Sequence, residues 1–493
     1  MCNKIVLVLV VVAIGKCHIH NKFPENFKFG VASSAYQIEG GWNANGKGEN
    51  IWDHFTHNFP NSTADRTNGD IACDSYHLWK NDIALLKYLN VSFYRFSISW
   101  SRILPTGFTN TINLDGVRYY NNIIDELIRN KIEPMVTLYH WDLPQPIQDI
   151  GGMTNPLIAD YFVDYATTAF YFFGDRVKTW ITFNEPIKIC LQGYENGLYA
   201  PGIKSRGIGC YLCSKTLLLA HANTYHVYKS YFKSVQHGKV GIAIDSDWYE
   251  PKTNSKEDEK SVERVLQMNF GWWINPIFSK GGNYPRIMRE RIDKFSKTQN
   301  FSISRLPVLT SSEIRTIKGT YDFLGLNHYS SKLVKARTSL LSRMPSFDND
   351  VRVDIETDPN WEKSALELMP VVPWGLRKLL NWIRKMYNNP TVYITENGYP
   401  DKGGLDDEDR ISYHTQYLNE LINAIRDGCN VQRYTIWSLM DSMEWTSGYK
   451  IKFGLYHVDF SDENRPRTPK KSASFYKNVI RDHGVPNIKR NIN

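Results

Sequence analysis

Eight short apolar segments, spread along almost the whole 493-residue chain, constrain the fold more than any other feature of the sequence. Each is rich in β-branched and aromatic residues, as strands buried on both faces are. Each is also followed by helix-like or long loop sequence. The expected strands are residues 27–37, 92–99, 133–140, 177–184, 239–245, 321–328, 391–395 and 431–438.

This alternation of strand and helix predicts an α/β fold with a single parallel barrel. Eight such units close into a (β/α)8 TIM barrel, which can exceed about 400 residues when its βα loops carry insertions. No linker, low-complexity tract or short repeat divides the chain, so residues 18–493 are expected to form one domain. The longest insertions, residues 248–315 and 330–369, should lie above the same barrel face.

The first 17 residues are typical of a secretory signal peptide. They combine Lys4, an apolar run over residues 5–14 and a small residue, Gly15, near a plausible cleavage point. The run is shorter than the roughly 20 apolar residues that a transmembrane helix needs, and no later segment supplies them. We therefore expect a secreted protein, extracellular or in a digestive lumen, with no membrane partner. Three sequons agree with export and are predicted glycosylation sites: Asn61, Asn90 and Asn300.

Charge and cysteine content exclude several classes of protein. The formal net charge of +8 is spread along the chain without a basic block, which argues against a nucleic-acid partner. Outside the leader, which contains Cys2 and Cys17, the few cysteines imply no disulfide framework. Cys210 and Cys213 have no second Cys/His pair of matching spacing, so we expect buried or locally bridged thiols and no metal site.

Two of the expected strands end in a glutamate. Residues 177–186, V-K-T-W-I-T-F-N-E-P, bring Glu185 to a strand end, and residues 391–398, T-V-Y-I-T-E-N-G, bring Glu396 to another. Either glutamate alone is more often a surface carboxylate than a functional group. Because the carboxyl ends of barrel strands meet at one mouth, the pair is a candidate for one active site.

The other strand ends, and the loop after the eighth strand, supply the side chains that a sugar site requires. A monosaccharide has an apolar C–H face and a rim of hydroxyls, so it needs aromatic platforms together with hydrogen-bonding groups. Trp141, Trp437 and Trp445 are the candidate platforms, although any one of 14 tryptophans is more often a core residue. The candidate polar groups are Gln37, Arg95, His140, Asn184, Asn327, Tyr329 and Glu444.

Together, the Asn-Glu-Pro and Thr-Glu-Asn-Gly strand ends and their flanking motifs resemble glycoside hydrolase family 1, the β-glucosidase type of retaining glycosidase. The resemblance runs from about residue 23 to about residue 480. It implies that Glu185 is the general acid/base and Glu396 the nucleophile. Retaining hydrolysis needs two carboxyl groups about 5–5.5 Å apart, one protonated to assist the leaving group and one ionised to attack the anomeric carbon.

The resemblance also assigns supporting roles. Arg95 and Tyr329 would hold Glu396 ionised, while the charge of Glu396 and burial would keep Glu185 protonated. Asn184 would bind the sugar 2-hydroxyl, and Glu444 the 4- and 6-hydroxyls. The implied substrate-binding set is Gln37, His140, Trp141, Asn184, Asn327, Tyr329, Trp437, Glu444, Trp445 and Phe453.

The chain departs from the family pattern at a few positions near these residues. Ser442 and Met443 stand where many members have Asn-Phe, Lys452 stands where arginine is usual, and Ile187 replaces a common tryptophan toward the leaving group. These departures leave the preference among glucose, galactose and fucose open.

We therefore expect a β-glucosidase whose partner is a small-molecule β-glycoside and which needs no cofactor; a homodimer is left open. One alternative is a thioglucosidase acting on glucosinolates, whose anionic leaving group Lys188 and Lys332 could meet. The competing interpretation is that both are ordinary surface lysines. Plant thioglucosidases of this family have glutamine at the acid/base position, so Glu185 favours an oxygen glycosidase. Another alternative is a catalytically silent sugar-binding member, against which the presence of both carboxylates argues.

Overall fold

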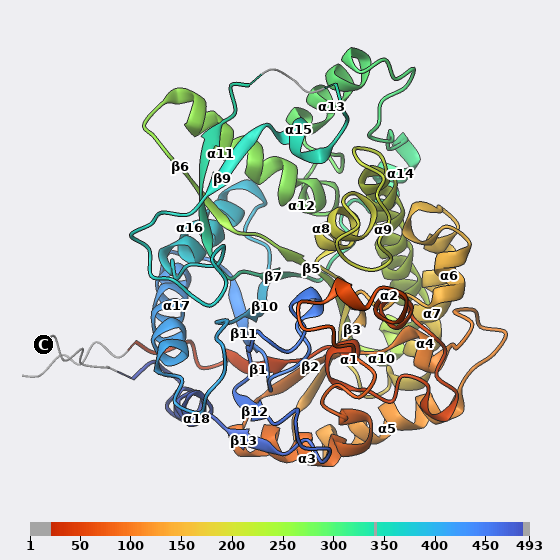
Figure 1. Ribbon diagram of the computed structural model, residues 1–493, viewed down its shortest axis with the longest axis vertical. Helices are drawn as coiled ribbons and strands as arrows, with labels where there is room; N and C mark the ends of the chain where they lie inside the picture. Colours follow the sequence, from red (N-terminus) through yellow and green to blue (C-terminus); the bar gives the residue numbers. More distant parts are fainter. Residues whose placement is uncertain (1–20, 340–342, 487–493) are drawn as a thin grey trace, which may run out of the picture.

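The computed structural model describes residues 21–339 and 343–486, and it contains the expected barrel (Figure 1). The predicted signal peptide lies outside these residues. Eight parallel strands close in the order β1-β11-β10-β7-β5-β4-β3-β2. The strands are β1 Lys28–Ala32, β2 Phe93–Ser97, β3 Glu133–Tyr139, β4 Thr179–Asn184, β5 Lys239–Asp245, β7 Phe323–Asn327, β10 Val392–Asn397 and β11 Val431–Trp437.

The barrel interior is filled by side chains. One buried cluster takes one member from each of six neighbouring strands, from β2 round to β10, and fills the inside of the barrel. Its members are Phe93, Met135, Ile181, Ala243, Phe323 and Tyr393. This packed layer closes the barrel, so a ligand on the barrel axis would lie at a mouth.

Helices cover the outside of the barrel, each with an apolar stripe toward the strands. In α16, Leu376, Leu379, Leu380 and Ile383 recur at helical spacing and are buried. The main outer helices are α3 Ser75–Leu89, α5 Leu114–Arg129, α7 Ile158–Phe173, α9 Gly209–Val227, α14 Ser311–Ile317, α16 Trp374–Met386, α17 Glu408–Arg426 and α18 Lys471–Asp482. Shorter helices in the connections are α1 Ala35–Ile38, α2 Ile51–Asn58, α4 Trp100–Ile103, α6 Gln145–Asp149, α8 Pro186–Lys188 and α10 Lys233–Gln236.

The two long insertions form one structure, in the upper part of Figure 1. A strand of the first insertion pairs in parallel with a strand of the second, which pairs antiparallel with a third. These strands are β6 Trp248–Pro251, β8 Ser331–Ala336 and β9 Val353–Glu356. The helices are α11 Lys256–Asn269, α12 Gly271–Phe278, α13 Arg286–Thr298 and α15 Phe347–Val351. A separate hairpin pairs β12 Tyr456–Val458 with β13 Arg467–Pro469.

Of the predicted strand ends that differ from the structure, those of the first and the seventh strand matter most for the site. The first strand ends at Ala32, and the chain turns into α1, so Gln37 lies on a helix and not at the strand end. The turn is fixed where the Ala35 amide donates to Ser97 Oγ at 2.7 Å. The seventh strand continues through Asn397, because Glu396 still pairs with Asn327 on β7.

One disulfide joins Cys190 to Cys213. The local bridge is therefore made by Cys213 with Cys190, and Cys210 is a buried free thiol, as are Cys73 and Cys429. The disulfide ties the segment after α8 to α9, on the rim of the barrel mouth.

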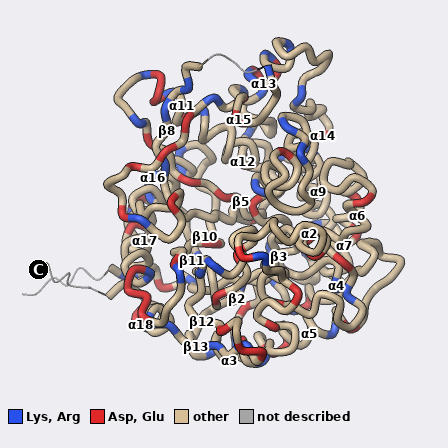
Figure 2. The backbone as a smooth tube through the Cα atoms, viewed as in Figure 1, with Lys and Arg blue, Asp and Glu red and all other residues tan. Residues whose placement is uncertain are grey.

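The surface is mixed in charge. Figure 2 shows Lys and Arg interspersed with Asp and Glu over the described chain. No helix within residues 21–339 and 343–486 is long and apolar enough to cross a membrane. Asn61, Asn90 and Asn300 are all exposed, and their glycosylation stays a prediction.

Candidate active site

A cavity of about 410 Å³ lies at the carboxyl ends of the barrel strands. It collects most of the residues that the sequence singles out for sugar binding and catalysis. Those that line it are His140, Trp141, Asn184, Glu185, Asn327, Tyr329, Glu396, Trp437, Glu444, Trp445 and Phe453. Gln37 and Arg95 are not among the lining residues; both are buried behind the wall, where they contact residues that do line it.

Glu185 stands at the turn from β4 to α8. Its backbone adopts a left-handed conformation with a φ of 48°, which is unusual for a residue with a side chain. Its amide donates to the Ala243 carbonyl at 2.9 Å, and Pro186, which lacks an amide hydrogen, begins the next helix. This sharp turn brings the carboxyl into the cavity, where Asn327 Nδ2 donates to Glu185 Oε1 at 2.7 Å.

The surroundings of Glu185 favour its protonated form. Burial raises the pKa of this carboxyl well above its usual range, and the charges of Asp245 and Glu396 raise it further. Lys188 and the hydrogen bond from Asn327 act in the opposite direction. A carboxyl that keeps its proton near neutral pH can serve as a general acid.

Glu396 has the opposite surroundings. Arg95 Nη1 donates to Glu396 Oε1 at 2.7 Å, and the Tyr329 hydroxyl donates to Glu396 Oε2 at 2.7 Å. Both donors stabilise the ionised carboxylate. Burial and the neighbouring Glu396 raise the pKa of Tyr329 well above its usual range, so the phenol stays a donor.

One hydrogen-bond network holds the two glutamates. Arg95 Nη2 donates to Asn184 Oδ1 at 2.6 Å, and Asn327 Nδ2 donates to the same oxygen at 3.0 Å as well as to Glu185. Asn184 Nδ2 in turn donates to His140 Nε2 at 3.1 Å. The two carboxyl groups are therefore fixed relative to each other by a rigid polar frame, as acid/base chemistry requires.

The other side of the cavity has the features of a hydroxyl-binding subsite. Gln37 Nε2 donates to Glu444 Oε2 at 3.2 Å and to the Met443 carbonyl at 2.7 Å. Burial and the charge of Glu396 raise the pKa of Glu444 to about 8. Glu444 is thus held in place by Gln37 and can exchange hydrogen bonds with a ligand in either protonation state.

The three predicted aromatic platforms differ in how they are held. Trp437 and Trp445 each stack against His140, with ring centroids 5.6 and 5.8 Å apart. Trp141 packs against Trp445 at 4.4 Å, and its Nε1 donates to the Asn184 carbonyl at 2.9 Å. All three line the cavity, and Trp141 also supports Asn184 from behind.

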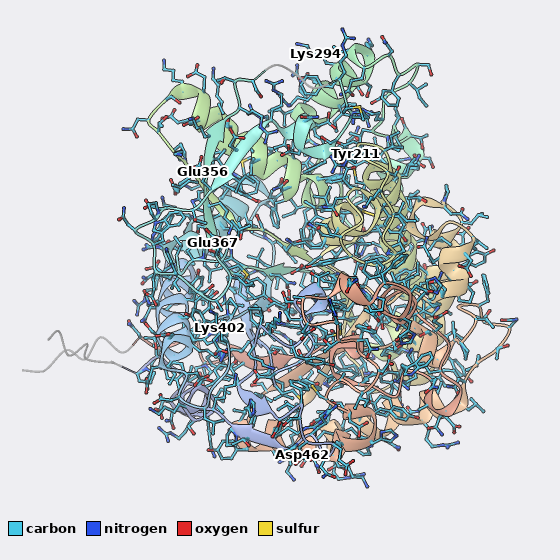
Figure 3. The ribbon with its side chains drawn as sticks, in the orientation of Figure 1. Tyr211, Lys294, Glu356, Glu367, Lys402 and Asp462 are labelled. Atoms are coloured by element: carbon cyan, nitrogen blue, oxygen red, sulfur yellow. A yellow bond between two sulfur atoms is a disulfide. The ribbon has the colours of Figure 1, made fainter. Side chains whose placement is uncertain are left out.

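The outer part of the cavity is formed largely by the βα loops. Glu367, labelled in Figure 3, marks the loop between β9 and α16, which supplies several apolar side chains. That loop supplies Leu366, Leu368 and Met369; the other apolar and aromatic residues in the outer part of the cavity are Ile187, Leu191, Tyr199 and Tyr249. The charged ones are Lys188, Asp245, Asp247 and Lys332. Asp245 is a lining residue that was not predicted, although it ends the expected fifth strand and strand ends meet at this mouth.

The two lysines of this region differ. Lys332 is buried, and its Nζ has no hydrogen-bond partner among the described residues, so the surface interpretation is wrong for it. Burial lowers the pKa of Lys332. Lys188 is partly exposed, and its Nζ lies 3.6 Å from Asp245 Oδ2.

Comparisons with known proteins agree with this geometry. The model of the family described as Glycosyl hydrolase family 1 matches residues 19–485. Myrosinase 1 of Brevicoryne brassicae is 49% identical over 93% of this chain and 98% of its own length. Human cytosolic beta-glucosidase is 42% identical over 94% of this chain and 99% of its own. The solved structure of an aphid myrosinase superposes with a TM-score of 0.89 at 49% identity, covering 93% of this chain and 99% of that one.

Proposed function

The chain belongs to glycosyl hydrolase family 1 and is a glycosyl hydrolase, and we propose that it is a secreted, retaining β-glycosidase that hydrolyses terminal β-D-glucosides. The observation that carries this proposal is the different environment of two carboxyl groups in one cavity. Glu185 has a raised pKa, whereas Glu396 is bound by the Arg95 guanidinium and the Tyr329 hydroxyl. This difference supplies the acid and the nucleophile of a double displacement.

In the first step, Glu396 attacks the anomeric carbon while Glu185 gives its proton to the glycosidic oxygen, and the aglycone leaves. The product is a glycosyl ester on Glu396. Because an ester is neutral, Glu185 loses one of the charges that raised its pKa. Glu185 can then take a proton from water, which attacks the anomeric carbon and restores the free Glu396 carboxylate with net retention.

Secretion and glycosylation are parts of the proposal that rest on the sequence. The leader-like residues 1–17 and the exposed sequons at Asn61, Asn90 and Asn300 support them. Expression in insect cells tests both: the protein should reach the medium without its leader, and removal of N-glycans should lower its mass. Retention inside the cells with an intact leader would contradict this part.

A second candidate function is thioglucoside hydrolysis. Two observations favour it: the 49% identity to Myrosinase 1, and the buried Lys332 Nζ, which has no hydrogen-bond partner in the described part of the chain and could meet an anionic aglycone. Glu185 remains the argument for oxygen glycosides, because a general acid matters most for leaving groups that need protonation.

A panel of substrates distinguishes these functions. The purified protein should hydrolyse 4-nitrophenyl and alkyl β-D-glucosides, and comparison with the galactoside and fucoside gives the sugar preference. An allyl glucosinolate tests the second function. A kcat/KM for the glucosinolate above that for every oxygen glycoside would replace the first proposal by the second.

A further inference from the structure

Lys188 and Asp245 form an ion pair close to Glu185 in the wall of the cavity. Lys188 Nζ lies 3.6 Å from Asp245 Oδ2, while Asp245 Oδ1 is buried without a hydrogen-bond partner among the described residues. All three side chains line the same cavity. Both members of the pair are therefore close to the group that we propose to be the general acid.

The backbone fixes how near these groups are. Lys188 follows Glu185 by three residues, and its amide donates to the Glu185 carbonyl at 2.9 Å, so the two lie on one helical turn. Oppositely charged residues at this spacing attract each other. Asp245 ends β5, the strand next to β4, and the Glu185 amide donates to Ala243 two residues earlier on that strand.

A lysine on the same turn as a general acid is a hazard for catalysis. If its ammonium paired with Glu185, the carboxyl would ionise and could no longer protonate a leaving group. Asp245 offers Lys188 a second partner on the neighbouring strand. We propose that Asp245 is a positioning residue that holds the Lys188 ammonium away from Glu185, so that Glu185 keeps its proton until the glycosidic oxygen accepts it.

This inference rests on the proposed acid role of Glu185. The charged groups that face Glu185 come from three elements: Asp245 on β5, Glu396 on β10 and Lys188 on α8. The phenols of Tyr199 and Tyr329 also lie near it and are neutral, because burial raises the pKa of both. Asp247 and Lys332 flank the pair, and each interacts with Lys188.

The two members of the pair act on Glu185 with opposite sign. The Asp245 charge raises the pKa of Glu185, and the Lys188 charge lowers it. Burial raises the pKa of Asp245 itself, and Lys188 opposes that rise and favours the carboxylate. In the intact pair the two charges oppose each other, and the effect of Asp245 on Glu185 is the larger, so the pair favours the protonated acid.

The test is the alkaline limb of kcat/KM against pH, which reports the protonated acid of the free enzyme. In Asp245→Asn the loss of the Asp245 charge and the freed Lys188 should together move this limb to lower pH by about one unit, which is roughly a tenfold loss of kcat/KM above the limb. In Lys188→Met the unopposed Asp245 should move it to higher pH. In the double variant, which lacks both charges, the limb should lie between those of the two single variants.

The pair Lys233–Asp322 is a matched control. Its atoms lie 2.6 Å apart, and the side chains are 37% and 17% exposed, against 43% and 16% for Lys188 and Asp245. Neither residue lines the cavity, and Asp322 binds the Val240 amide at the other end of β5. Lys233→Met and Asp322→Asn should leave the limb unmoved.

Opposite shifts in the two single variants support the inference. Shifts in the same direction, or no shift in either, overturn it. Should Asp245→Asn fail to fold, Lys188→Met alone decides by the direction of its shift. The proposed function fails separately: if Glu185→Gln keeps wild-type kcat/KM on an alkyl glucoside, Glu185 is not the acid, whatever Asp245 and Lys188 do.

Discussion

Arg95 on β2 and Glu396 on β10 form a 2.7 Å ion pair between strands that are not neighbours in the barrel. The guanidinium is 1% exposed and donates also to Thr137, the Thr395 carbonyl and Asn184. The nucleophile is thus held from across the barrel mouth by a buried group that three further hydrogen bonds fix in place. The same arginine connects Glu396, through Asn184 and Asn327, to Glu185.

Replacement of this arginine should therefore cost more than one hydrogen bond. Lysine keeps the charge of Arg95 but cannot reproduce a planar fork that bonds Glu396 and Asn184 together. We expect Arg95→Lys to lower kcat/KM by about 10²-fold or more, as the loss of a preorganised donor does elsewhere. Tyr329→Phe, which removes only the bond to Glu396 Oε2, should cost less. Steady-state kinetics measure this. Equal kcat/KM in Arg95→Lys and wild type would show that the hydrogen bonds of Arg95 are not needed to hold the two carboxyl groups.

The acid role of Glu185 predicts a dependence on the leaving group. Glu185→Ala should slow substrates with poor leaving groups by about 10²–10⁴-fold and activated aryl glucosides much less, because an activated aryloxide departs without a proton. Azide should restore turnover and give the β-azide. Glu396→Ala should lose activity on both substrate types, with any azide product of α configuration. Equal loss on every substrate in both variants, without rescue, would show that the roles are misassigned.

Glu444 predicts where the sugar is recognised. Gln37 holds its carboxyl in the cavity, and a buried polar group left without its hydrogen-bond partner costs about 1–3 kcal/mol. Glu444→Gln should therefore lower kcat/KM for the glucoside by about tenfold or more and for the 6-deoxyglucoside by less, since that sugar lacks one proposed partner. The ratio of the two kcat/KM values is the measurement. An unchanged ratio would remove Glu444 from recognition of the 6-hydroxyl.

The buried Asp142 should make the free energy of unfolding depend on pH. The side chain is 1% exposed, neither carboxyl oxygen has a partner in another described residue, and burial raises its pKa to about 7. The folded state thus keeps a proton that the unfolded state loses near pH 4, so Asp142 costs stability progressively between about pH 4 and 7. Asp142→Asn should be more stable than wild type at pH 8, by up to about 4 kcal/mol, and similar at pH 4. Denaturant unfolding of both proteins at pH 4 and pH 8 checks this. An equal gain in stability of Asp142→Asn at the two pH values would contradict the raised pKa of Asp142.

The sequence predicted the barrel because each of its strands is buried on both faces and therefore reads as an apolar run. It predicted most of the site because strand ends such as Asn184-Glu185 and Glu396 meet at one mouth in that fold. What it could not predict depends on packing between distant segments. The pairing of Cys213 with Cys190 depends on how α9 packs on the segment after α8, and the burial of Lys332 depends on the pairing of β8 with β6.

Gln37 shows the limit in another way. Its motif was recognised, yet its place at the end of a strand was wrong, because the chain leaves the β1 ladder at Ala32 and continues as a helical turn. The residue still contacts Glu444, since α1 extends the strand toward the same mouth. Motif recognition thus identified a site residue whose local structure it could not give.

The central claim is a double displacement through Glu396, and covalent trapping tests it most directly. A 2-deoxy-2-fluoro-β-glucoside with a good leaving group slows the second step more than the first, so the glycosyl-enzyme should accumulate. Mass spectrometry should then show one added fluoroglucosyl group per chain, located in the digest on Glu396, with activity returning as the ester hydrolyses. An adduct on any other residue, or first release of the sugar as the α-anomer from a β-glucoside, would contradict the claim.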